Sequence, residues 1–110
     1  MEKIKEYSLK FDKKFLEKYR RKIDTNTQKI IDKKILRLKD NPIQWKPLFN
    51  IYPHLYELYA DSYRIYYLVQ HNEIRIILIA YEHKDEQQKF LNSIKKDKNS
   101  IVKVLEENSR

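Results

Sequence analysis

Four side chains in the second half of the sequence carry functional groups that can handle a phosphate ester. Arg64 has a planar guanidinium, which can bind a phosphate through two parallel hydrogen bonds and stabilise added negative charge. His83 has an imidazole, which can both accept and donate a proton and so suits proton transfer, and the neighbouring Lys84 adds a cation. Glu57 supplies a carboxylate that can act as a general base. Together these groups suit a site that binds a phosphate and moves protons around it.

Each of these side chains also has a purely structural interpretation. Arg64 can form an ion pair with Asp61 or Glu57 at the edge of a sheet. His83 and Lys84 can be no more than the solvated end of a strand. The sequence leaves both interpretations open.

Length, composition and charge narrow the class of protein. The 110-residue chain fits one domain, and its 41% of hydrophobic residues is enough for a packed core. Lysine and arginine number 24 against 16 acidic residues, a formal net charge of +8. This excess favours a polyanionic partner such as nucleic acid, an anionic membrane or an acidic protein. The alternative is a lysine-rich chain with solvated helices, because net charge reports on association and solubility rather than on fold.

The composition also excludes several kinds of site. The chain has no cysteine, which excludes disulfides, thiolate metal sites and a cysteine nucleophile. His54 and His71 are expected in turns, and three scattered histidines have no metal-ligand spacing, so we expect no metal. No apolar run approaches the roughly 18 residues of a membrane span. The first 11 residues lack the apolar core of a secretory signal, so we expect a cytoplasmic location.

The elements that must position these groups begin with a strand. Residues 4–11 alternate, with Tyr7, Leu9 and Phe11 on one side, as in a half-buried strand. An isolated strand leaves its backbone groups unpaired, so this segment must join a sheet formed later in the chain.

Two helices are predicted next. Aromatic and apolar residues recur every four residues from Phe11 to Ile23, and Asp12 can cap this first helix. Thr25 and Gln28 have the spacing of a capping box for a second helix, which Asp40-Asn41-Pro42 ends. The short link between the helices predicts an antiparallel hairpin.

The second half of the chain predicts a sheet and a final helix. After a loop at residues 42–54, strand-like runs span Leu55–Ala60, Tyr63–Gln70 and Glu73–Tyr81, and their short links require antiparallel neighbours. Helical periodicity returns from Asp85, and Asp97–Ser100 either breaks this helix or dips it into solvent. The predicted fold is α+β, in the order β-α-α-β-β-β-α, with an antiparallel sheet packed against the N-terminal helical hairpin and a C-terminal helix.

The charge excess lies mostly on the predicted hairpin. Residues 1–40 hold 14 basic and 7 acidic side chains, whereas residues 41–83 hold 3 basic and 4 acidic ones. A hairpin surface of this kind can hold RNA through salt-sensitive, non-specific contacts, or be only a solvated helix face. It includes Lys13, Lys14, Lys18, Arg20, Arg21, Lys22, Lys33 and Lys34.

The order and spacing of these features resemble the RelE/ParE toxin superfamily over about residues 4–94. In the family a "kPL" loop, an aromatic strand, a Tyr-Arg pair, two further strands and a basic end follow one another. The matching segments are Lys46-Pro47-Leu48, Tyr56-Glu57-Leu58-Tyr59, Tyr63-Arg64, Ile65–Val69, Ile74–Ala80 and His83-Lys84-Asp85. We therefore expect a RelE-like domain at residues 1–94 and a helical extension at residues 95–110.

The resemblance implies the toxin of a toxin–antitoxin pair, held by a small acidic antitoxin. RelE-type members cut mRNA in the ribosomal A site without a metal or other cofactor, and the RNA 2′-hydroxyl attacks its own 3′ phosphate. ParE-type members share the fold and poison DNA gyrase. The ribosome-dependent endoribonuclease is our first hypothesis, and a ParE-like gyrase inhibitor or a decayed toxin that only binds its antitoxin are the alternatives.

The resemblance also implies roles for individual residues. Arg64 matches the catalytic arginine of RelE-type toxins, and His83 with Lys84 match the basic group at the end of the last strand. Lys46 in the loop is expected to contact the RNA backbone, as are Lys13, Lys14, Lys18, Arg20 and Arg21 on the hairpin. The chain departs from the family in having Glu57 and Tyr59 where basic residues are usual, and Phe90 where a tyrosine is common.

Overall fold

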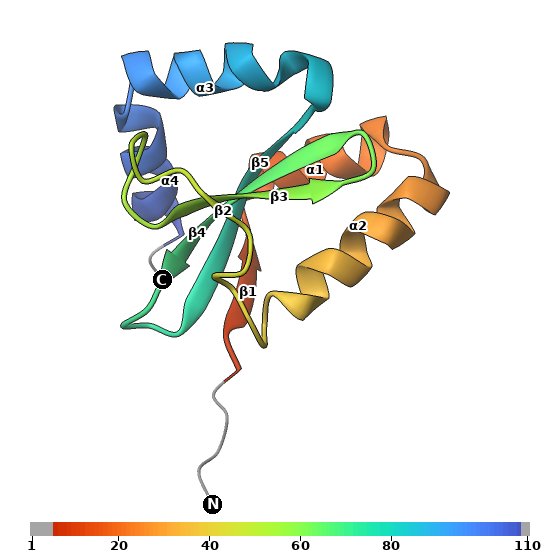
Figure 1. Cartoon of the computed structure of the whole chain (residues 1–110), viewed down its shortest axis with the longest axis horizontal. Helices are drawn as coiled ribbons and strands as arrows, with labels where there is room; N and C mark the ends of the chain where they lie inside the picture. Colours follow the sequence, from red (N-terminus) through yellow and green to blue (C-terminus); the bar gives the residue numbers. More distant parts are fainter. Residues whose placement is uncertain (1–5, 109–110) are drawn as a thin grey trace, which may run out of the picture.

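The computed structural model describes residues 6–108, which form a sheet with helices on both faces (Figure 1). The α+β fold and the order of its main elements are as predicted. The elements are β1 (Ser8–Phe11), α1 (Lys13–Lys22), α2 (Thr25–Arg37), β2 (Lys46–Pro47), β3 (Leu55–Ala60), β4 (Tyr63–Gln70), β5 (Arg75–His83), the 3₁₀ turn η1 (Lys84–Glu86), α3 (Gln87–Lys96) and α4 (Asn99–Glu107).

The sheet has five strands in the order β1-β5-β4-β3-β2. Strands β2 to β5 pair antiparallel, but β1 pairs parallel to β5, with Ser8 opposite Arg75 and Phe11 opposite Leu78. The sheet is therefore mixed, not wholly antiparallel as predicted, because two helices and three strands separate β1 from β5 and impose no hairpin geometry on that pair. Residues 4 and 5 of the predicted first strand lie outside the described residues.

One face of the sheet, the hairpin face, packs against α1 and α2. Alternate strand residues point to this face, including Leu58 on β3, Ile65 and Tyr67 on β4 and Leu78 on β5. They meet Phe15, Tyr19, Ile23, Ile31, Ile35 and Leu38 of the hairpin segment, all of them buried. The four-residue periodicity of α1 is thus the stripe that covers this core.

The opposite face, the C-terminal face, packs against α3 and α4 (Figure 1). The strand residues between those of the hairpin face point here, among them Leu55, Tyr66, Leu68, Ile77 and Ile79. Leu91 and Ile94 of α3 and Ile101 of α4 cover them. The β4–β5 register shifts at Tyr66/Tyr67, which leaves Ile79 of β5 without a partner on β4. The alternation of β5 therefore changes there, and Tyr81 points to the hairpin face, as Leu78 does.

The helix caps differ from two of the predictions. Asp12 is at the N-cap position of α1 but makes no side-chain capping bond, because its Oδ1 accepts a hydrogen bond from Asn108 Nδ2. Asp24, rather than Thr25, caps α2, since its carboxylate accepts from the backbone N–H of Thr27. Thr27 therefore gives the Asp24 carboxyl two hydrogen bonds and lowers its pKa, whereas Gln28 donates to backbone carbonyls of the α1 end.

The C-terminal segment consists of two helices instead of one. Asp97 and Lys98 separate α3 from α4, which resolves the open question about Asp97–Ser100 as a break. The end of α4 is anchored to the start of the chain, where Asn108 donates to Asp12 and Lys10 Nζ donates to the Asn108 carbonyl at 3.0 Å. Within residues 6–108, no helix is long and apolar enough to cross a membrane.

Candidate functional site

Arg64 lies on β4, directly opposite Tyr59 of β3 and Glu82 of β5. Its guanidinium carbon sits 4.5 Å from the centre of the Tyr59 ring, and one of its terminal nitrogens donates to the Tyr63 carbonyl at 3.2 Å. Its Nε is buried without a hydrogen-bond partner, and in residues 6–108 Arg64 makes no ion pair with Asp61 or Glu57. The cation therefore retains hydrogen-bonding capacity for an anion.

Glu57 lies on the same face of the sheet as Arg64, because both alternate with residues of the hairpin face. The residue is 0% exposed, and its Oε2 accepts a hydrogen bond from Gln87 Nε2 of α3 at 2.6 Å. Its Oε1 is buried and has no partner among the described residues. A buried carboxylate with one oxygen unsatisfied is costly, so this position is not explained by packing alone.

Tyr66 completes a polar cluster that the sequence alone did not indicate. It lies opposite Glu57 in the β3–β4 register, and its buried hydroxyl makes no hydrogen bond of normal geometry in the described part of the chain. Burial, and after it the negative charge of the Glu57 carboxylate and its position as a hydrogen-bond acceptor for Tyr66, raise the pKa of the Tyr66 hydroxyl. The two-residue spacing from Arg64 to Tyr66 was the available signal, since it puts both side chains on one face of a strand.

We call Glu57, Arg64, Tyr66 and Gln87 the polar cluster. Three of its side chains come from β3 and β4, and the fourth comes from the first turn of α3. Phe90, one turn further along α3, stacks on the Tyr66 ring with 4.4 Å between ring centres. Phe90 is thus a partly buried cover over the cluster, which is consistent with its lack of a hydroxyl.

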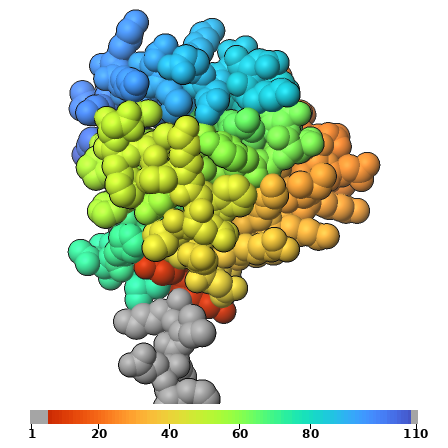
Figure 2. Space-filling view, viewed as in Figure 1, coloured from red at the N-terminus to blue at the C-terminus, as the bar shows by residue number. Residues whose placement is uncertain are grey.

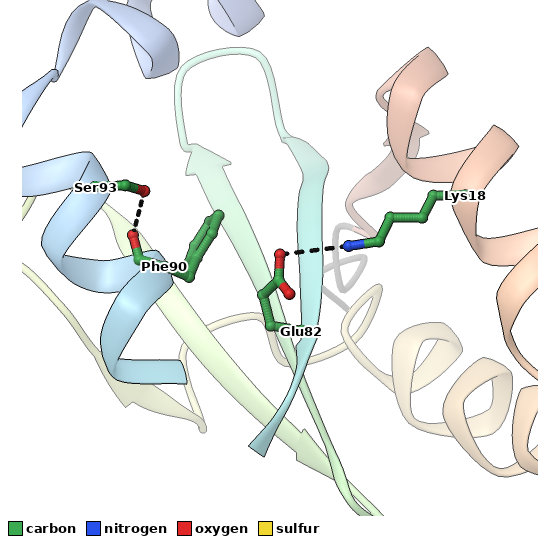
Figure 3. A network of polar contacts seen from close by, with 4 residues as sticks. All are labelled: Lys18, Glu82, Phe90 and Ser93. Atoms are coloured by element: carbon green, nitrogen blue, oxygen red, sulfur yellow. Dashed lines mark hydrogen bonds and ion pairs between the residues drawn. The ribbon is translucent and has the colours of Figure 1, made fainter. Parts of the chain in front are cut away.

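Glu82 ends the row of side chains that crosses the sheet beside the cluster. Its Oε1 lies 3.4 Å from Lys18 Nζ of α1, so the carboxylate points toward α1 (Figure 3). Lys18 also sits 4.8 Å from the centre of the Tyr81 ring. Of the hairpin cations predicted to hold RNA, Lys18 is thus fixed close to the end of β5.

His83 and Lys84 follow at the end of β5, as the sequence predicted. His83 points to the hairpin face, because its ring lies 5.6 Å from that of Tyr63, its partner in the register. Its Nδ1 accepts from the backbone N–H of Asp85 at 3.2 Å and lies 3.3 Å from Asp85 Oδ2. Arg64 and His83 therefore lie on opposite faces of the sheet, although their strands are neighbours.

The other predicted RNA contacts lie on the surface. Lys46 is exposed on β2, where it pairs with Glu57 in the register. The side chains of Lys13, Lys14, Lys18, Arg20 and Arg21 project from α1, and all five residues are exposed. Among residues 6–108 there is no group of three His, Cys, Asp or Glu side chains that could hold a metal ion.

Comparison with known proteins bears on the fold. No family model matches the sequence, and a search of curated proteins found no match either. A solved structure of a double mutant of the E. coli toxin RelE in the free state matches with a TM-score of 0.69 and 22% identity, covering 84% of this chain and 97% of that chain. The chain has a RelE-like fold.

Solved structures of two toxin–antitoxin complexes also contain a chain that is similar to this one. The intact E. coli RelBE complex matches with a TM-score of 0.63 and 25% identity, over 70% of this chain and 95% of that chain. The RelBE2 complex from Mycobacterium tuberculosis matches with a TM-score of 0.64 and 15% identity, over 76% of this chain and 97% of that chain. In this chain, the polar cluster lies on the face of the sheet that α3 covers.

Proposed function

We propose that this protein is the toxin of a toxin–antitoxin pair and a ribosome-dependent mRNA endonuclease. The observation that carries the proposal is Arg64, a partly buried cation with no ion pair in residues 6–108, next to a buried carboxylate and a buried phenol on a RelE-like sheet. Uncompensated polar groups of this kind are expected at functional sites, where stability is sacrificed for chemistry. A polyanionic substrate also matches the net charge of +8.

The proposed reaction needs only groups that RNA and this chain supply. The 2′-hydroxyl attacks the adjacent 3′ phosphorus, the bond from phosphorus to the 5′ oxygen breaks, and a cyclic phosphate and a 5′-hydroxyl result. Arg64 would stabilise the added charge on the phosphorane oxygens. Lys84, the exposed first residue of η1 directly after β5, would stabilise the leaving oxygen.

Proton transfer is assigned to the two remaining candidates. Glu57 would accept the proton of the 2′-hydroxyl. Because Glu57 has no solvent exposure, this role requires Gln87 to move aside and open its carboxylate to the RNA. His83 would return a proton to the leaving oxygen. Since His83 lies on the hairpin face, this role requires the RNA to pass around the end of β5.

The remaining surface supports binding rather than chemistry. We assign the cations of α1, together with Lys46, to salt-sensitive contacts with RNA backbone. A small acidic antitoxin would neutralise the same basic surface, and both partners are cytoplasmic in this proposal. We also propose that residues 1–94 form the toxin domain and that residues 95–110 are a helical extension.

The test is a primer-extension map of cuts in a defined mRNA on programmed ribosomes. We expect wild-type protein to cut the mRNA and Arg64→Ala to cut at least 100-fold more slowly, as removal of a group that stabilises a transition state does. Arg75→Ala is the matched control, because Arg75 lies at the other end of β5 and bonds Gln70 at 2.7 Å. Intact mRNA with the wild type, or undiminished cutting by Arg64→Ala, would contradict the proposal.

One observation favours a ParE-like gyrase inhibitor as the second candidate. The strands of the sheet carry four lysine or arginine side chains, namely Lys10, Lys46, Arg64 and Arg75, and two of them, Lys10 and Arg75, already have hydrogen-bond partners. A protein target needs fewer cations on the sheet than an RNA substrate does. Loss of DNA supercoiling by gyrase in the presence of wild-type protein, with no RNA cleavage, would favour this candidate, and normal supercoiling would exclude it. Inactivity in both assays would leave a decayed toxin that only binds its antitoxin.

A further inference from the structure

Two adjacent aromatic rings with a cation at each end extend from the polar cluster to α2. Lys34 Nζ of α2 is 5.5 Å from the centre of the Trp45 ring, and Trp45 meets Tyr59 edge to face with 6.2 Å between ring centres. Arg64 then lies over Tyr59 at 4.5 Å. We call Lys34, Trp45, Tyr59 and Arg64 the aromatic row.

The row joins segments that are distant in sequence. Lys34 Nζ also donates to the Tyr59 carbonyl at 2.9 Å, so α2 is tied to the end of β3. The segments that carry the row, orange for α2, yellow for the loop before β3 and green for β3, adjoin on one face of the molecule (Figure 2). The row is therefore a surface feature shared by the hairpin and the sheet.

The ring of Tyr59 is the exposed member of the aromatic row, and packing in the core does not explain its position. Tyr59 is 37% exposed, whereas Leu55 and Glu57, which lie on the same face of β3, are fully buried. A tyrosine that serves only the core would be expected to be buried like those residues. An exposed ring held between a second aromatic and two cations is instead the usual arrangement for binding unpaired bases, because every base has a face that can stack and each nucleotide carries a phosphate.

We propose that Tyr59, supported by Trp45, stacks on an unpaired base of single-stranded RNA while Arg64 and Lys34 bind the phosphates on either side of that base. The proposal rests on the proposed function, because it describes how the mRNA is held next to Arg64. It also gives a reason for the departure at Tyr59: the ring takes the place of a charge contact and binds the nucleotide through its base.

The test uses the single tryptophan of the chain as an internal reporter. A base that stacks on Tyr59 lies next to Trp45, so titration with a six-nucleotide oligouridylate at low salt is expected to change the tryptophan fluorescence and yield a dissociation constant. Tyr59→Leu is expected to weaken binding roughly 10-fold or more, the effect of losing one base–aromatic stack. Tyr59→Phe is expected to bind within about 2-fold of the wild type, because stacking needs the ring and not the hydroxyl.

Phe49→Leu is the matched control, because Phe49 is another exposed aromatic residue and packs on Tyr56 away from the row. It is expected to bind like the wild type. Equal affinity of Tyr59→Leu and wild type would overturn the proposal, as would equal losses in Tyr59→Leu and Tyr59→Phe. If Tyr59→Leu fails to fold, Tyr59→Trp gives the decision, since a larger ring must bind at least as tightly as the wild type and weaker binding would refute stacking.

The same variants separate this inference from the proposed function. The titration needs no ribosome, so it gives a result even when programmed ribosomes show no cut with the wild type and the proposed function fails. Conversely, when the wild type cuts mRNA and Tyr59→Leu cuts and binds equally well, the proposed function stands and the stacking role is refuted.

Discussion

Glu57 and Leu58 are neighbours on β3, and both are 0% exposed, yet they are buried in opposite ways. Leu58 points to the hairpin face, where apolar and aromatic side chains surround it. Glu57 points to the C-terminal face, where its Oε2 has the single partner Gln87 and its Oε1 has none among the described residues. One residue step along a strand thus separates a packed core from a polar cluster.

The hairpin face and the polar cluster therefore contribute to the free energy of folding with opposite signs. The hairpin face gains free energy from burial of hydrocarbon, at about 25 cal/mol per Å². The polar cluster loses free energy, because a buried carboxylate with an unsatisfied oxygen costs several kcal/mol unless other contacts compensate it. We infer that the hairpin face provides stability and that the C-terminal face near Arg64 is reserved for binding.

Leu58→Ala is the variant with the largest expected effect on stability. Removal of this fully buried side chain is expected to lower the free energy of unfolding by about 2–5 kcal/mol, through lost burial and the cavity that remains. Urea unfolding followed by circular dichroism measures it. Leu36→Ala, at a position 58% exposed on α2, is the control and should change stability by less than about 0.5 kcal/mol. Equal effects of the two variants would contradict the assignment of stability to the hairpin face.

Glu57→Gln tests the opposite face with the smallest change of shape. The amide can still accept the hydrogen bond from Gln87, but the buried charge is gone, so stability is expected to rise on the order of 1 kcal/mol. The measurement is the same urea titration at pH 7, with the exposed Glu73→Gln as control. A clear loss of stability would mean that the carboxylate is compensated and that the contrast between the two faces is wrong.

Tyr81→Phe has the smallest expected effect and is visible only at high pH. Burial, followed by the negative charges of nearby groups, raises the pKa of Tyr81 on the hairpin face to about 12, and its hydroxyl is buried without a partner in residues 6–108. The unfolded chain loses this proton near pH 10. The contribution of Tyr81 is therefore complete below pH 10 and is lost as the pH rises to about 12. Denaturation curves between pH 8 and 12 should fall less steeply for Tyr81→Phe, and parallel curves would contradict the prediction.

Local periodicity was sufficient for most of the fold. The predicted runs Leu55–Ala60 and Tyr63–Gln70 coincide with β3 and β4, and the four-residue spacing from Phe11 to Ile23 marks the buried side of α1. Such patterns are local, since a strand alternates every two residues and a helix repeats every 3.6. The bounds of β5 were predicted less well. The strand begins at Arg75 and ends at His83, two residues later at each end than predicted.

The sequence also contained part of the candidate site. It put Arg64 and Glu57 on adjacent antiparallel strands, and the structure has them on one face. It did not reveal that His83 lies on the other face, because the register shift near Tyr66 decides how β5 continues past that point. Tyr66 was overlooked among nine tyrosines, although its spacing from Arg64 was informative.

From the sequence alone, periodicity identified the buried side of α1 and the strands β3 and β4, and the distribution of charge put most of the basic excess on the hairpin. Three long-range features became visible only in the folded chain: β1 runs parallel to β5, Gln87 bonds Glu57 across 30 residues of chain, and Asn108 bonds Asp12 across 96. The reason is physical: secondary structure follows from interactions between near neighbours, whereas the choice of which helix covers which face depends on the packing of the whole chain. The polar cluster, formed by two strands and a distant helix, depends on this packing of the whole chain.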